Sequence, residues 1–354
     1  MSTEIKLAYG EKMPLEMHKV RIVQKLNLPK VEDRLKFMNE AGNNTFLLQN
    51  RDIFMDMLTD SGVNAMSDRQ QAAMLIADDS YAGSETFNRL SEQVGKMFNT
   101  KYFLPAHQGR ACENILAEAF VKPGQTVLMN FHFTTTKAHI TRLGGTVEEL
   151  IVKEGLDPHD LSPFKGNFDL DLLRERIATL GAENVAFVRI EAGTNLVGGQ
   201  PLSMENMLAV ADICKQNGIM TVLDASLLQD NLYFIKVREE AAKDMSIEDI
   251  TLKIANAMDI IYFSARKLGS AKGGGIVVDD KALFDKMKVL IPIYEGFLTY
   301  GGMSTREMEA VAVGLEEATD MDMISHGPEF ISEFARILTG YGIPLVTPAG
   351  GLGL

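Results

Sequence analysis

Residues 219–226 read IMTVLDAS and residues 260–267 read IIYFSARK, and these two stretches decide the fold. Each is a nearly unbroken apolar run that ends in polar residues. Such runs are typical of strands in a parallel sheet that is covered on both faces. We expect an amphipathic helix before the first stretch, over Met204–Asn217, with Ser203 as its N-cap and Gly218 just past its end.

Outward from these stretches, short β-type runs alternate with longer helical segments. This alternation predicts an α/β fold with a mostly parallel sheet. Ligands bind such sheets at the carboxyl ends of the strands, so we expect functional side chains directly after the runs. The predicted strands are Lys101–Pro105, Thr126–Phe131, Thr146–Val152, Asn184–Glu191, Ile219–Ala225, Met258–Ser264 and Gly274–Val278.

The composition argues against several classes of protein. The chain has 354 residues, of which 46% are hydrophobic, and its 35 Lys and Arg against 48 Asp and Glu give a net charge of -13. Such an acidic surface repels phosphate backbones and anionic lipids, so we expect neither nucleic-acid nor membrane binding. Cys112 and Cys214 form no CxxC pair, which fits a reducing compartment. Without a secretory signal or a long apolar run, the sequence predicts a cytoplasmic protein.

A carboxylate and a lysine follow two consecutive predicted strands. Asp224 closes the first stretch, and Lys267 follows the second. Alone, each is more often a turn aspartate or a surface lysine. Together they form the arrangement that pyridoxal phosphate needs, because a carboxylate keeps the pyridine nitrogen protonated while a lysine amine forms the Schiff base.

The same cofactor needs a cradle for its phosphate. Gln108, Gly109 and Arg110 follow a predicted strand and open a helix, where backbone N–H groups form an anion site. Ser264 and Arg266, on either side of the second strand end, complete the predicted cradle.

The sequence offers a ring-stacking partner for this cofactor but no metal site. Phe133 follows the run Thr126–Phe131 and is positioned to stack on a cofactor ring, although a phenylalanine there is more often part of a core. The histidines, among them His107, His132 and His139, have no metal-ligand spacing, so zinc catalysis is not expected.

Ordered motifs from residue 58 onward resemble those of the aromatic amino acid β-eliminating lyases, the family of tryptophanase and tyrosine phenol-lyase. This family has a pyridoxal-phosphate-dependent transferase-like large domain of the aspartate aminotransferase type, with a mostly parallel sheet, and a small α+β domain, which is incomplete in this sequence. The motifs are LTDSGVNAMS (58–67), DDSYAGS (78–84), HQGR (107–110), FTTT (133–136), NLVGGQP (195–201), NLYFIK (231–236), YEGF (294–297) and YGG (300–302).

The resemblance implies a role for each matched residue. Lys267 would bind pyridoxal 5'-phosphate and remove the substrate α-proton, and Asp224 would pair with the pyridine nitrogen. Phe133 would stack on the ring, and Asn195 would lie near its phenolic oxygen. Tyr81 resembles the tyrosine that protonates the leaving group. The implied reaction is β-elimination of tryptophan or tyrosine to indole or phenol, pyruvate and ammonia.

The resemblance also implies substrate and cation contacts. Thr59 and Ser61 match positions that contact the substrate carboxylate. Thr134 resembles the phenol-lyase version of its position, whereas Phe297 resembles the tryptophanase version, so the substrate stays open. A monovalent cation, K⁺ in the family, is expected near Gly62 and Asp79.

Three positions depart from the family pattern. Leu227 replaces an arginine three residues after the cofactor aspartate, which removes a cation near the cofactor. Arg266 and Leu268 flank Lys267 where the family has lysine and aspartate. Lys272 is a hypothetical replacement for the bound cation, because its ammonium carries the same charge.

We expect an N-terminal arm with the start of a small domain over residues 1–50, a cofactor-binding large domain over 51–310, and the beginning of a truncated C-terminal domain over 311–354. Helices at Glu307–Ala318 and Glu329–Tyr341 and a strand at Gly342–Thr347 are expected near the end. Family members continue for about a hundred residues beyond this point, and the resemblance implies a homotetramer.

Two alternatives remain open. One is β-elimination of another amino acid, such as cysteine or serine, on the same scaffold; Leu227 and Arg266 favour it. The other is a truncated chain that binds the cofactor without catalysis.

Overall fold

The structure, a computed structural model, describes residues 4–14, 19, 25–56, 58, 65–351 and 353. The chain divides into two compact units, one formed by Met1–Leu15 with Asn64–Leu354 and the other by Glu16–Val63. The smaller unit contains helix α1 (Val31–Glu40) and two short 3-10 helices, η1 (Thr45–Leu47) and η2 (Asn50–Asp52). The larger unit carries the predicted sheet.

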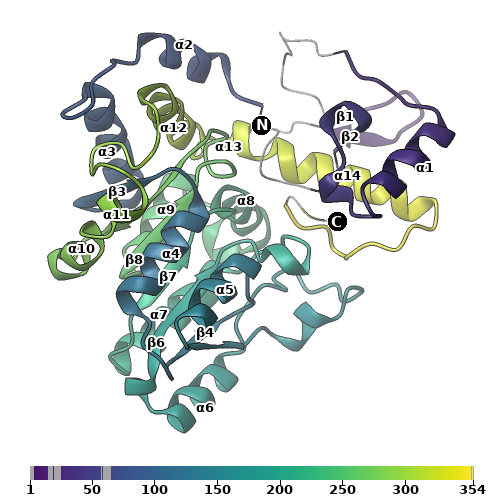
Figure 1. Cartoon of the computed structure of the whole chain (residues 1–354). Helices are drawn as coiled ribbons and strands as arrows, with labels where there is room; N and C mark the ends of the chain where they lie inside the picture. Colours follow the sequence, from purple (N-terminus) through teal and green to yellow (C-terminus); the bar gives the residue numbers. More distant parts are fainter. Residues whose placement is uncertain are drawn as a thin grey trace. The chain divides into compact units, whose positions relative to one another are not determined.

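Every predicted strand from residue 101 to 278 belongs to one seven-stranded sheet, with the order β3-β9-β8-β7-β6-β4-β5 (Figure 1). Strands β5, β4, β6, β7 and β8 run parallel, and β9 pairs antiparallel with both β8 and β3. The predicted mostly parallel α/β sheet is thereby confirmed. The strands are β3 (Tyr102–Ala106), β4 (Thr126–Met129), β5 (Thr146–Glu149), β6 (Val185–Glu191), β7 (Thr221–Asp224), β8 (Ile260–Ser264) and β9 (Gly274–Val278).

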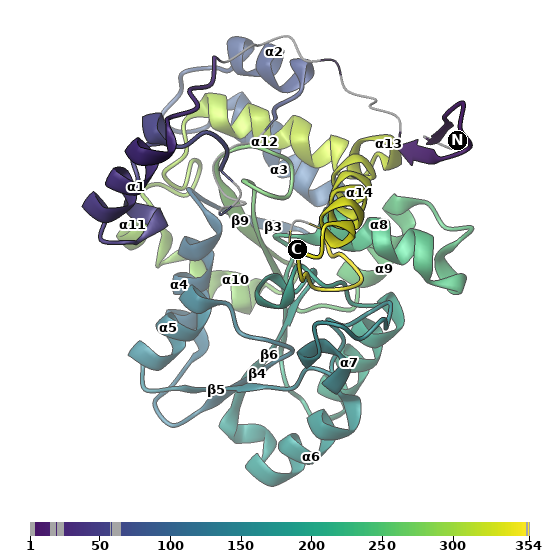
Figure 2. The same ribbon diagram turned by 90° about the vertical axis from the view of Figure 1, so that its right-hand side faces the viewer.

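Helices cover both faces of the sheet (Figures 1 and 2). The helices of the larger unit are α2 (Asp68–Ile76), α3 (Glu85–Phe98), α4 (Gly109–Phe120), α5 (Thr134–Arg142), α6 (Leu170–Leu180), α7 (Met204–Gln216), α8 (Leu228–Arg238), α9 (Ile247–Ala255), α10 (Lys281–Lys288), α11 (Ile291–Tyr294), α12 (Thr305–Glu317), α13 (Met321–Ile324) and α14 (His326–Gly340). The predicted N-cap of α7 is present, since the Ser203 hydroxyl accepts a hydrogen bond from the Asn206 N–H. None of the helices in the described ranges is long and apolar enough to cross a membrane.

Shorter elements complete the larger unit. An antiparallel hairpin of β1 (Glu4–Lys6) and β2 (Lys12–Pro14) lies near its N-terminus. The 3-10 helices are η3 (Lys153–Leu156), η4 (Ala182–Asn184), η5 (Asn195–Val197) and η6 (Glu240–Ala242).

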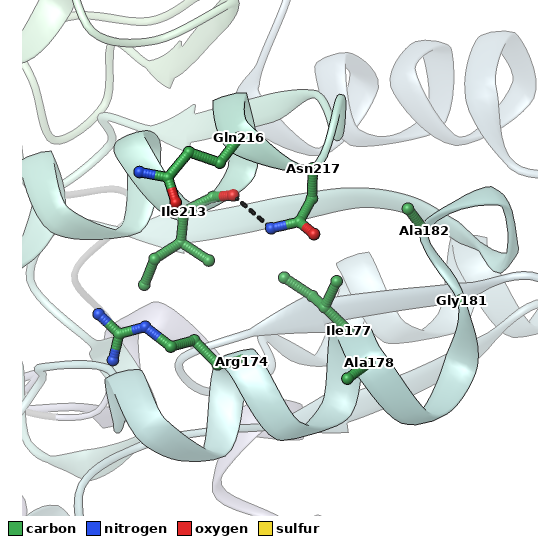
Figure 3. A pocket seen from close by; sticks show the side chains of 8 residues that line it. All are labelled: Arg174, Ile177, Ala178, Gly181, Ala182, Ile213, Gln216 and Asn217. Carbon is green, nitrogen blue, oxygen red and sulfur yellow. Dashed lines mark hydrogen bonds between the residues drawn. The ribbon is translucent and has the colours of Figure 1, made fainter.

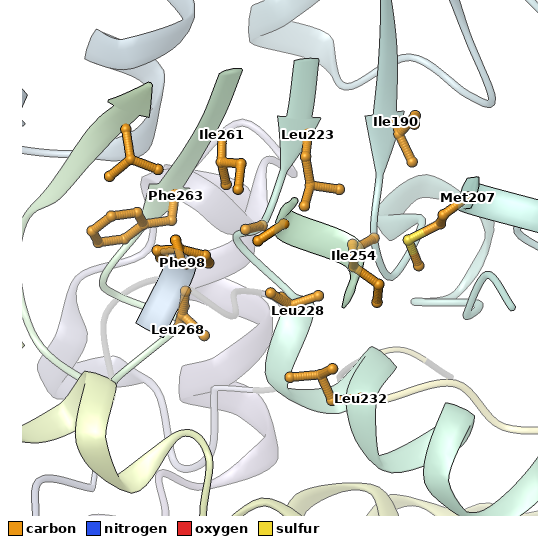
Figure 4. Packing of buried hydrophobic residues seen from close by; sticks show 14 of the residues in the cluster. Phe98, Ile190, Met207, Leu223, Leu228, Leu232, Ile254, Ile261, Phe263 and Leu268 are labelled. Atoms are coloured by element: carbon orange, nitrogen blue, oxygen red, sulfur yellow. The ribbon is translucent and has the colours of Figure 1, made fainter. Parts of the chain in front are cut away.

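Alternation along the strands separates two apolar layers. On β7 and β8, Leu223 and Phe263 point into the layer beneath α7 and α9 (Figure 4), whereas Val222 and Tyr262 point toward α4. Side chains two residues apart on a strand share a face. Asp224, two residues after Val222, therefore lies on the α4 face. This assigns the predicted cofactor aspartate to one side of the sheet.

The predicted strand Gly342–Thr347 is wrong, because this segment is irregular. Gly342 turns the chain with a φ of 78°, and Pro344 has no N–H to give to a strand ladder. The Thr347 N–H instead donates to the Pro158 carbonyl at 2.7 Å. The apolar run is thus anchored to a loop and not to a strand.

Candidate active site

Three neighbouring strands end in polar side chains at one edge of the sheet. Glu191 on β6 is paired in register with Asp224 on β7, and Asp224 with Tyr262 on β8. Ser264 is the last residue of β8, and its N–H donates to the Ser226 hydroxyl at 3.0 Å. The carboxyl edge, where ligands bind in parallel sheets, therefore carries Asp224 and Ser264 from adjacent strands.

Lys267 lies in a compact turn that follows β8. The Ala265 N–H donates to the Gly273 carbonyl at 2.9 Å, and the Ala271 N–H to the Ala265 carbonyl at 2.8 Å. These bonds close the turn, and the Lys267 N–H donates to the Ser264 carbonyl at 3.2 Å. Lys267 is half-buried. The turn thus holds the lysine three residues beyond a strand end.

Helix α12 and helix α2 hold this turn from outside. The buried Gln70 amide donates to the carbonyls of Gly269, in the turn, at 2.7 Å and of Ala310, in α12, at 2.9 Å. Gly314 of α12 packs so closely on Gly269 that a Cβ at Gly314 would overlap the Gly269 carbonyl oxygen. Gly269 itself has a φ of 88°, a conformation that favours glycine. Three segments distant in sequence therefore meet behind the lysine.

The predicted phosphate residues come together at the start of α4. The helix begins at Gly109, and the Gln108 side chain does not cap it. A Cβ added to Gly109 would lie 2.8 Å from the Ser264 Cβ, so only glycine fits against that strand end. Gln108 also forms a β-bridge with Gly273.

This arrangement fits a bound phosphate. Free N–H groups at the start of a helix attract anions, and a missing side chain lets the anion approach. The Ser264 side chain lies against this point. Arg110 is exposed and Arg266 half-buried, both at the ends of the segments that form the cradle.

A buried charged network surrounds Asp224, and the sequence analysis did not predict it. Arg189 of β6 is 1% exposed and lies on the same face two residues before Glu191. Its guanidinium donates to Asp224 Oδ2 at 2.5 Å, to Glu191 Oε2 at 2.8 Å and to the Tyr262 hydroxyl at 2.9 Å. The Tyr262 hydroxyl donates in turn to Asp224 Oδ2 at 2.7 Å. Every member of the network has a partner, as buried polar groups require.

The protonation states of this network follow from burial and charge. Burial opposes a charged Arg189, but the electrostatic contributions of Tyr262, Glu191 and Asp224 outweigh it and raise the pKa of Arg189 well above the ordinary arginine value. Burial raises the pKa of Tyr262 well above 10, so its hydroxyl stays protonated and serves as a donor. Burial also raises the pKa of Glu191, against the opposing effect of Arg189.

Glu113, on the first turns of α4, adds a further buried carboxyl beside the network. It is 6% exposed and accepts a hydrogen bond from the Thr135 hydroxyl at 2.5 Å. Burial raises its pKa to about 7, Arg189 opposes this, and Asp224 adds to it. Glu113 therefore exchanges a proton near neutral pH.

Replacing Glu113 with glutamine should remove a pH-dependent part of the stability. The folded-state pKa of about 7 exceeds the ordinary 4.5, so between these values the folded chain holds a proton that the unfolded chain has lost. Stability from this group is complete below pH 4.5 and is lost as the pH rises to about 7, by on the order of 3 kcal/mol. Urea denaturation from pH 4.5 to 8 measures it.

In that series, the wild-type unfolding free energy should fall with pH relative to Glu113→Gln. Glu205→Gln is the matched control, because this glutamate on α7 is exposed. Its curve should follow that of the wild type. Parallel curves for Glu113→Gln and wild type would contradict a proton held at Glu113.

The remaining predicted cofactor contacts lie at strand and helix ends. Phe133 occupies the N-cap position of α5 and is half-buried, and Thr134 beside it is exposed. The Asn195 N–H donates to Glu191 Oε1 at 3.1 Å. Asn195 is thereby tied to the same network that holds Asp224. The stacking role of Phe133 stays a prediction.

Tyr81 belongs to an aromatic cluster near the β3–α4 connection. Its ring lies 5.7 Å from that of Phe297 and 5.4 Å from that of Tyr300. A hydrogen bond with Tyr300 raises the pKa of Tyr81, although the Tyr81 side chain is 71% exposed. Glu295, two residues before Phe297, accepts a hydrogen bond from the His107 N–H at 3.0 Å. The cluster is therefore attached to the residue that precedes Gln108.

The structure describes only some of the residues that are predicted to contact the substrate carboxylate and the K⁺ ion. Thr59, Ser61 and Gly62 lie outside the described residues. Asp79 and Lys272 are exposed. Within the described part of the chain, no group of three or more metal-binding side chains comes together. The K⁺ site stays a prediction.

One further hollow lies away from this edge. It has a volume of about 410 Å³ and lies between the C-terminal ends of α6 and α7 (Figure 3). Gly181, Ala182 and Asn217 line it, and they precede β6 and β7. The hollow therefore opens at the amino edge of the sheet, opposite Asp224.

Comparisons with known proteins identify the family of the chain. Residues 56–347 match the beta-eliminating lyase family. A tyrosine phenol-lyase from Clostridium tetani is 41% identical over 96% of this chain and 74% of that protein. One from Lacrimispora saccharolytica is 40% identical over 95% of this chain and 72% of that protein.

The fold recurs in more distant structures. Leishmania major threonine aldolase has a TM-score of 0.64 and 16% identity, over 83% of this chain and 81% of that one. This likeness concerns the fold alone, and it confirms the predicted fold of type I pyridoxal-phosphate enzymes. With the family match over most of its length, the chain belongs to the beta-eliminating lyase family.

Proposed function

We propose that this carbon–carbon lyase removes phenol from L-tyrosine by β-elimination, leaving pyruvate and ammonia, with pyridoxal phosphate as cofactor. The observation that carries the proposal is the pair of Asp224 and Lys267 at adjacent strand ends, beside the Gly109–Ser264 cradle. Tyrosine is favoured because the relatives at about 40% identity are named tyrosine phenol-lyases.

Family membership implies pyridoxal phosphate, and the described residues fit it. The start of α4 with Ser264 would hold the phosphate, and Asp224 would face the ring nitrogen. The bound cofactor withdraws electrons from the substrate Cα and so makes its proton acidic.

Two side chains of this chain then move protons. The Lys267 amine takes the Cα proton, and the turn closed by Ala265 and Gly273 fixes where that amine projects. Tyr81 gives a proton to the aromatic leaving group. A tyrosine hydroxyl is protonated at neutral pH and has a proton to donate, and the hydrogen bond with Tyr300 raises the pKa of Tyr81 further.

We further propose a homo-oligomer, a tetramer by family resemblance. A general acid works best in a water-excluded site. Tyr81 is 71% exposed here, and its neighbour Phe297 is 38% exposed. A second subunit over this aromatic cluster would exclude the water. The predicted large domain over residues 51–310 and smaller part over 311–354 belong to the same proposal.

Replacing Gly109 with alanine should weaken cofactor binding. The new Cβ would lie 2.8 Å from the Ser264 Cβ and force the two segments of the cradle apart. Strain of about 1–3 kcal/mol raises Kd by roughly 5- to 160-fold. Titration of the apoprotein with pyridoxal phosphate, followed by absorbance, measures this change.

Gly340→Ala is the control for that titration. Gly340 ends α14, and nothing lies within 4 Å of an added Cβ. Its Kd should equal that of the wild type. If Gly109→Ala also kept the wild-type Kd, the phosphate would have to bind elsewhere.

A second reaction is favoured by one observation. Leu227, where the family has an arginine, is buried at 4% exposure against Gly193. The cofactor surroundings thus differ from the family pattern, which supports β-elimination of cysteine or serine derivatives as the alternative.

The test compares substrates. The purified chain with pyridoxal phosphate is given L-tyrosine, L-tryptophan and S-alkyl-L-cysteine, and pyruvate, phenol and indole are quantified. Phenol and pyruvate in equal amounts from tyrosine would support the proposal. Pyruvate from the cysteine derivative alone would favour the alternative, and no pyruvate with the cofactor still bound would indicate a silent chain.

The same assay tests the cation. We propose that K⁺ supports activity near Asp79. Exchange of potassium for tetramethylammonium salts should then lower pyruvate release. Full activity without potassium would instead support the Lys272 ammonium as the replacement.

A further inference from the structure

The network around Asp224 contains more charge than a simple cofactor contact requires. Asp224 Oδ2 already accepts hydrogen bonds from Arg189 and Tyr262, and Oδ1 accepts one from the Ser226 N–H at 2.9 Å. A carboxylate has about four acceptor positions. One acceptor position on Oδ1 is therefore left for a ring nitrogen. The other oxygen of the same carboxylate, Oδ2, is bound by the Arg189 guanidinium.

The charges of the network can be counted. Arg189 brings one positive charge against the carboxyls of Asp224 and Glu191, and Tyr262 is neutral. Helix α4 adds two groups to this face, Glu113 and Cys112. Burial keeps the Cys112 thiol protonated, since it raises its pKa well above 9. Among the described residues of the network, Arg189 is thus the cation that faces the buried carboxyls of Asp224, Glu191 and Glu113.

The position of Arg189 differs from that of the family's arginine. Position 227 lies three residues after Asp224, beyond the end of β7. Arg189 instead belongs to the neighbouring strand β6, from which its guanidinium reaches Asp224. Leu227 meanwhile fills its site with apolar atoms and packs on Gly193. In this chain, the cation that contacts the predicted cofactor aspartate therefore comes from the neighbouring strand β6.

We propose that Arg189 is a positioning residue that acts through Asp224 to oppose protonation of the cofactor ring nitrogen, and that Glu191 is the counter-charge that limits this effect. The proposal rests on the proposed function, because it takes the ring nitrogen to lie against Asp224.

Simple electrostatics gives the direction of each effect. A positive charge near the ring nitrogen disfavours its protonated, positive form, and a nearby negative charge favours it. Glu191 Oε2 holds the Arg189 guanidinium at 2.8 Å and so offsets its charge. Loss of Arg189 and loss of Glu191 should therefore shift the ring nitrogen in opposite directions.

A consequence follows for the reaction. The protonated ring nitrogen is the group that draws electrons from Cα. A ring nitrogen held close to its protonation midpoint withdraws electrons less strongly than one that is always protonated. Arg189 and Glu191 together would thus set the electron demand of the site, in place of the arginine absent at position 227.

The experiment reads the ring nitrogen directly. The full-length chain is loaded with pyridoxal phosphate labelled with ¹⁵N in the ring, and the nitrogen shift is followed by NMR from pH 5 to 10. Arg189→Met should raise the pKa of the ring nitrogen, and Glu191→Gln should lower it, each by about 1–3 units. Arg189→Lys keeps the charge and should stay close to the wild type.

A matched pair controls for the loss of any ion pair. Arg176 donates to Glu148 through two hydrogen bonds at 2.7 and 2.8 Å, on α6 and β5. Arg176→Met and Glu148→Gln make the same charge changes away from Asp224 and should leave the ring nitrogen unchanged.

Each outcome decides the proposal. A raised pKa in Arg189→Met with a lowered pKa in Glu191→Gln supports the proposal. Shifts of the same sign, shifts in the reverse directions, or no shift in Glu191→Gln overturn it. If Arg189→Met does not fold, a lowered ring-nitrogen pKa in Glu191→Gln together with an unchanged one in Arg189→Lys supports the proposal, and an unchanged or raised pKa in Glu191→Gln overturns it. If the wild type binds no labelled pyridoxal phosphate, the proposed cofactor is wrong. If it binds the label but releases no pyruvate, the proposed reaction is wrong. Both results differ from the ring-nitrogen shifts that would overturn the inference.

Discussion

Lyase turnover should be lost when Lys267 is replaced with alanine, with kcat falling by more than about 10⁴-fold. Loss of a general base alone costs about 10²–10⁴-fold, and this variant also loses the amine that attaches the cofactor. Pyruvate release under saturating substrate measures the effect. Because Lys267 is half-buried in a turn closed by backbone hydrogen bonds, the variant should fold.

Lys281→Ala is the matched control for that loss. Lys281 is an exposed lysine on α10 that pairs with Asp285. Its removal should leave pyruvate release unchanged. Added primary amines should restore part of the activity of Lys267→Ala, since they replace the missing base. A kcat within tenfold of the wild type would show that another residue is the base.

The second large effect is expected for Asp224→Asn, with a decrease in kcat of roughly 10²–10⁴-fold. An amide cannot hold a proton on the ring nitrogen, so Cα loses its electron sink. The variant also leaves the Arg189 guanidinium with one carboxylate partner fewer inside the protein. Removing one partner of a buried ion pair costs about 3–5 kcal/mol.

Asp259→Asn separates the expected loss of kcat from the expected loss of stability. Asp259 precedes β8 at the amino edge of the sheet, where it accepts hydrogen bonds from the Thr221 N–H at 2.7 Å and hydroxyl at 2.9 Å. This variant should lose stability without losing kcat. For both variants, pyruvate release gives kcat and urea denaturation gives the stability. Equal decreases in kcat would mean that Asp224 affects catalysis only through folding.

The sheet could be predicted because several of its strands, among them β7 and β8, are nearly continuous apolar runs. A parallel strand covered on both faces needs such a run, and a turn must follow it, so the position of Asp224 and Lys267 at strand ends followed directly. The segment Gly342–Thr347 has the same apolar character, but its contact with Pro158 is not visible in the local pattern. Local hydrophobicity indicates burial and does not identify the partner.

The sequence contains a pattern that indicates the charged network around Asp224. Arg189 and Glu191 lie two residues apart inside an apolar strand, which places both charges on one buried face. Such a pattern predicts an internal ion pair. Its partner Tyr262 could not be identified in this way, because strand register fixes the pairing and sequence does not give register.

Glu113 and Gln70 could not have been predicted. Both lie on helices whose polar residues are usually solvated, and each is buried by packing against segments distant in sequence. Their environment is a property of the assembled fold. It cannot be derived from the periodicity of a single helix.

The close contact of Gly314 with the Gly269 carbonyl has a mechanical consequence. No side chain separates the two backbones, and Gln70 bonds to both segments at once. Helix α12 therefore cannot slide along the lysine turn or tilt away from it as an independent element. A displacement of α12 would therefore carry the backbone of the turn with it, and the predicted base Lys267 would shift together with the helix.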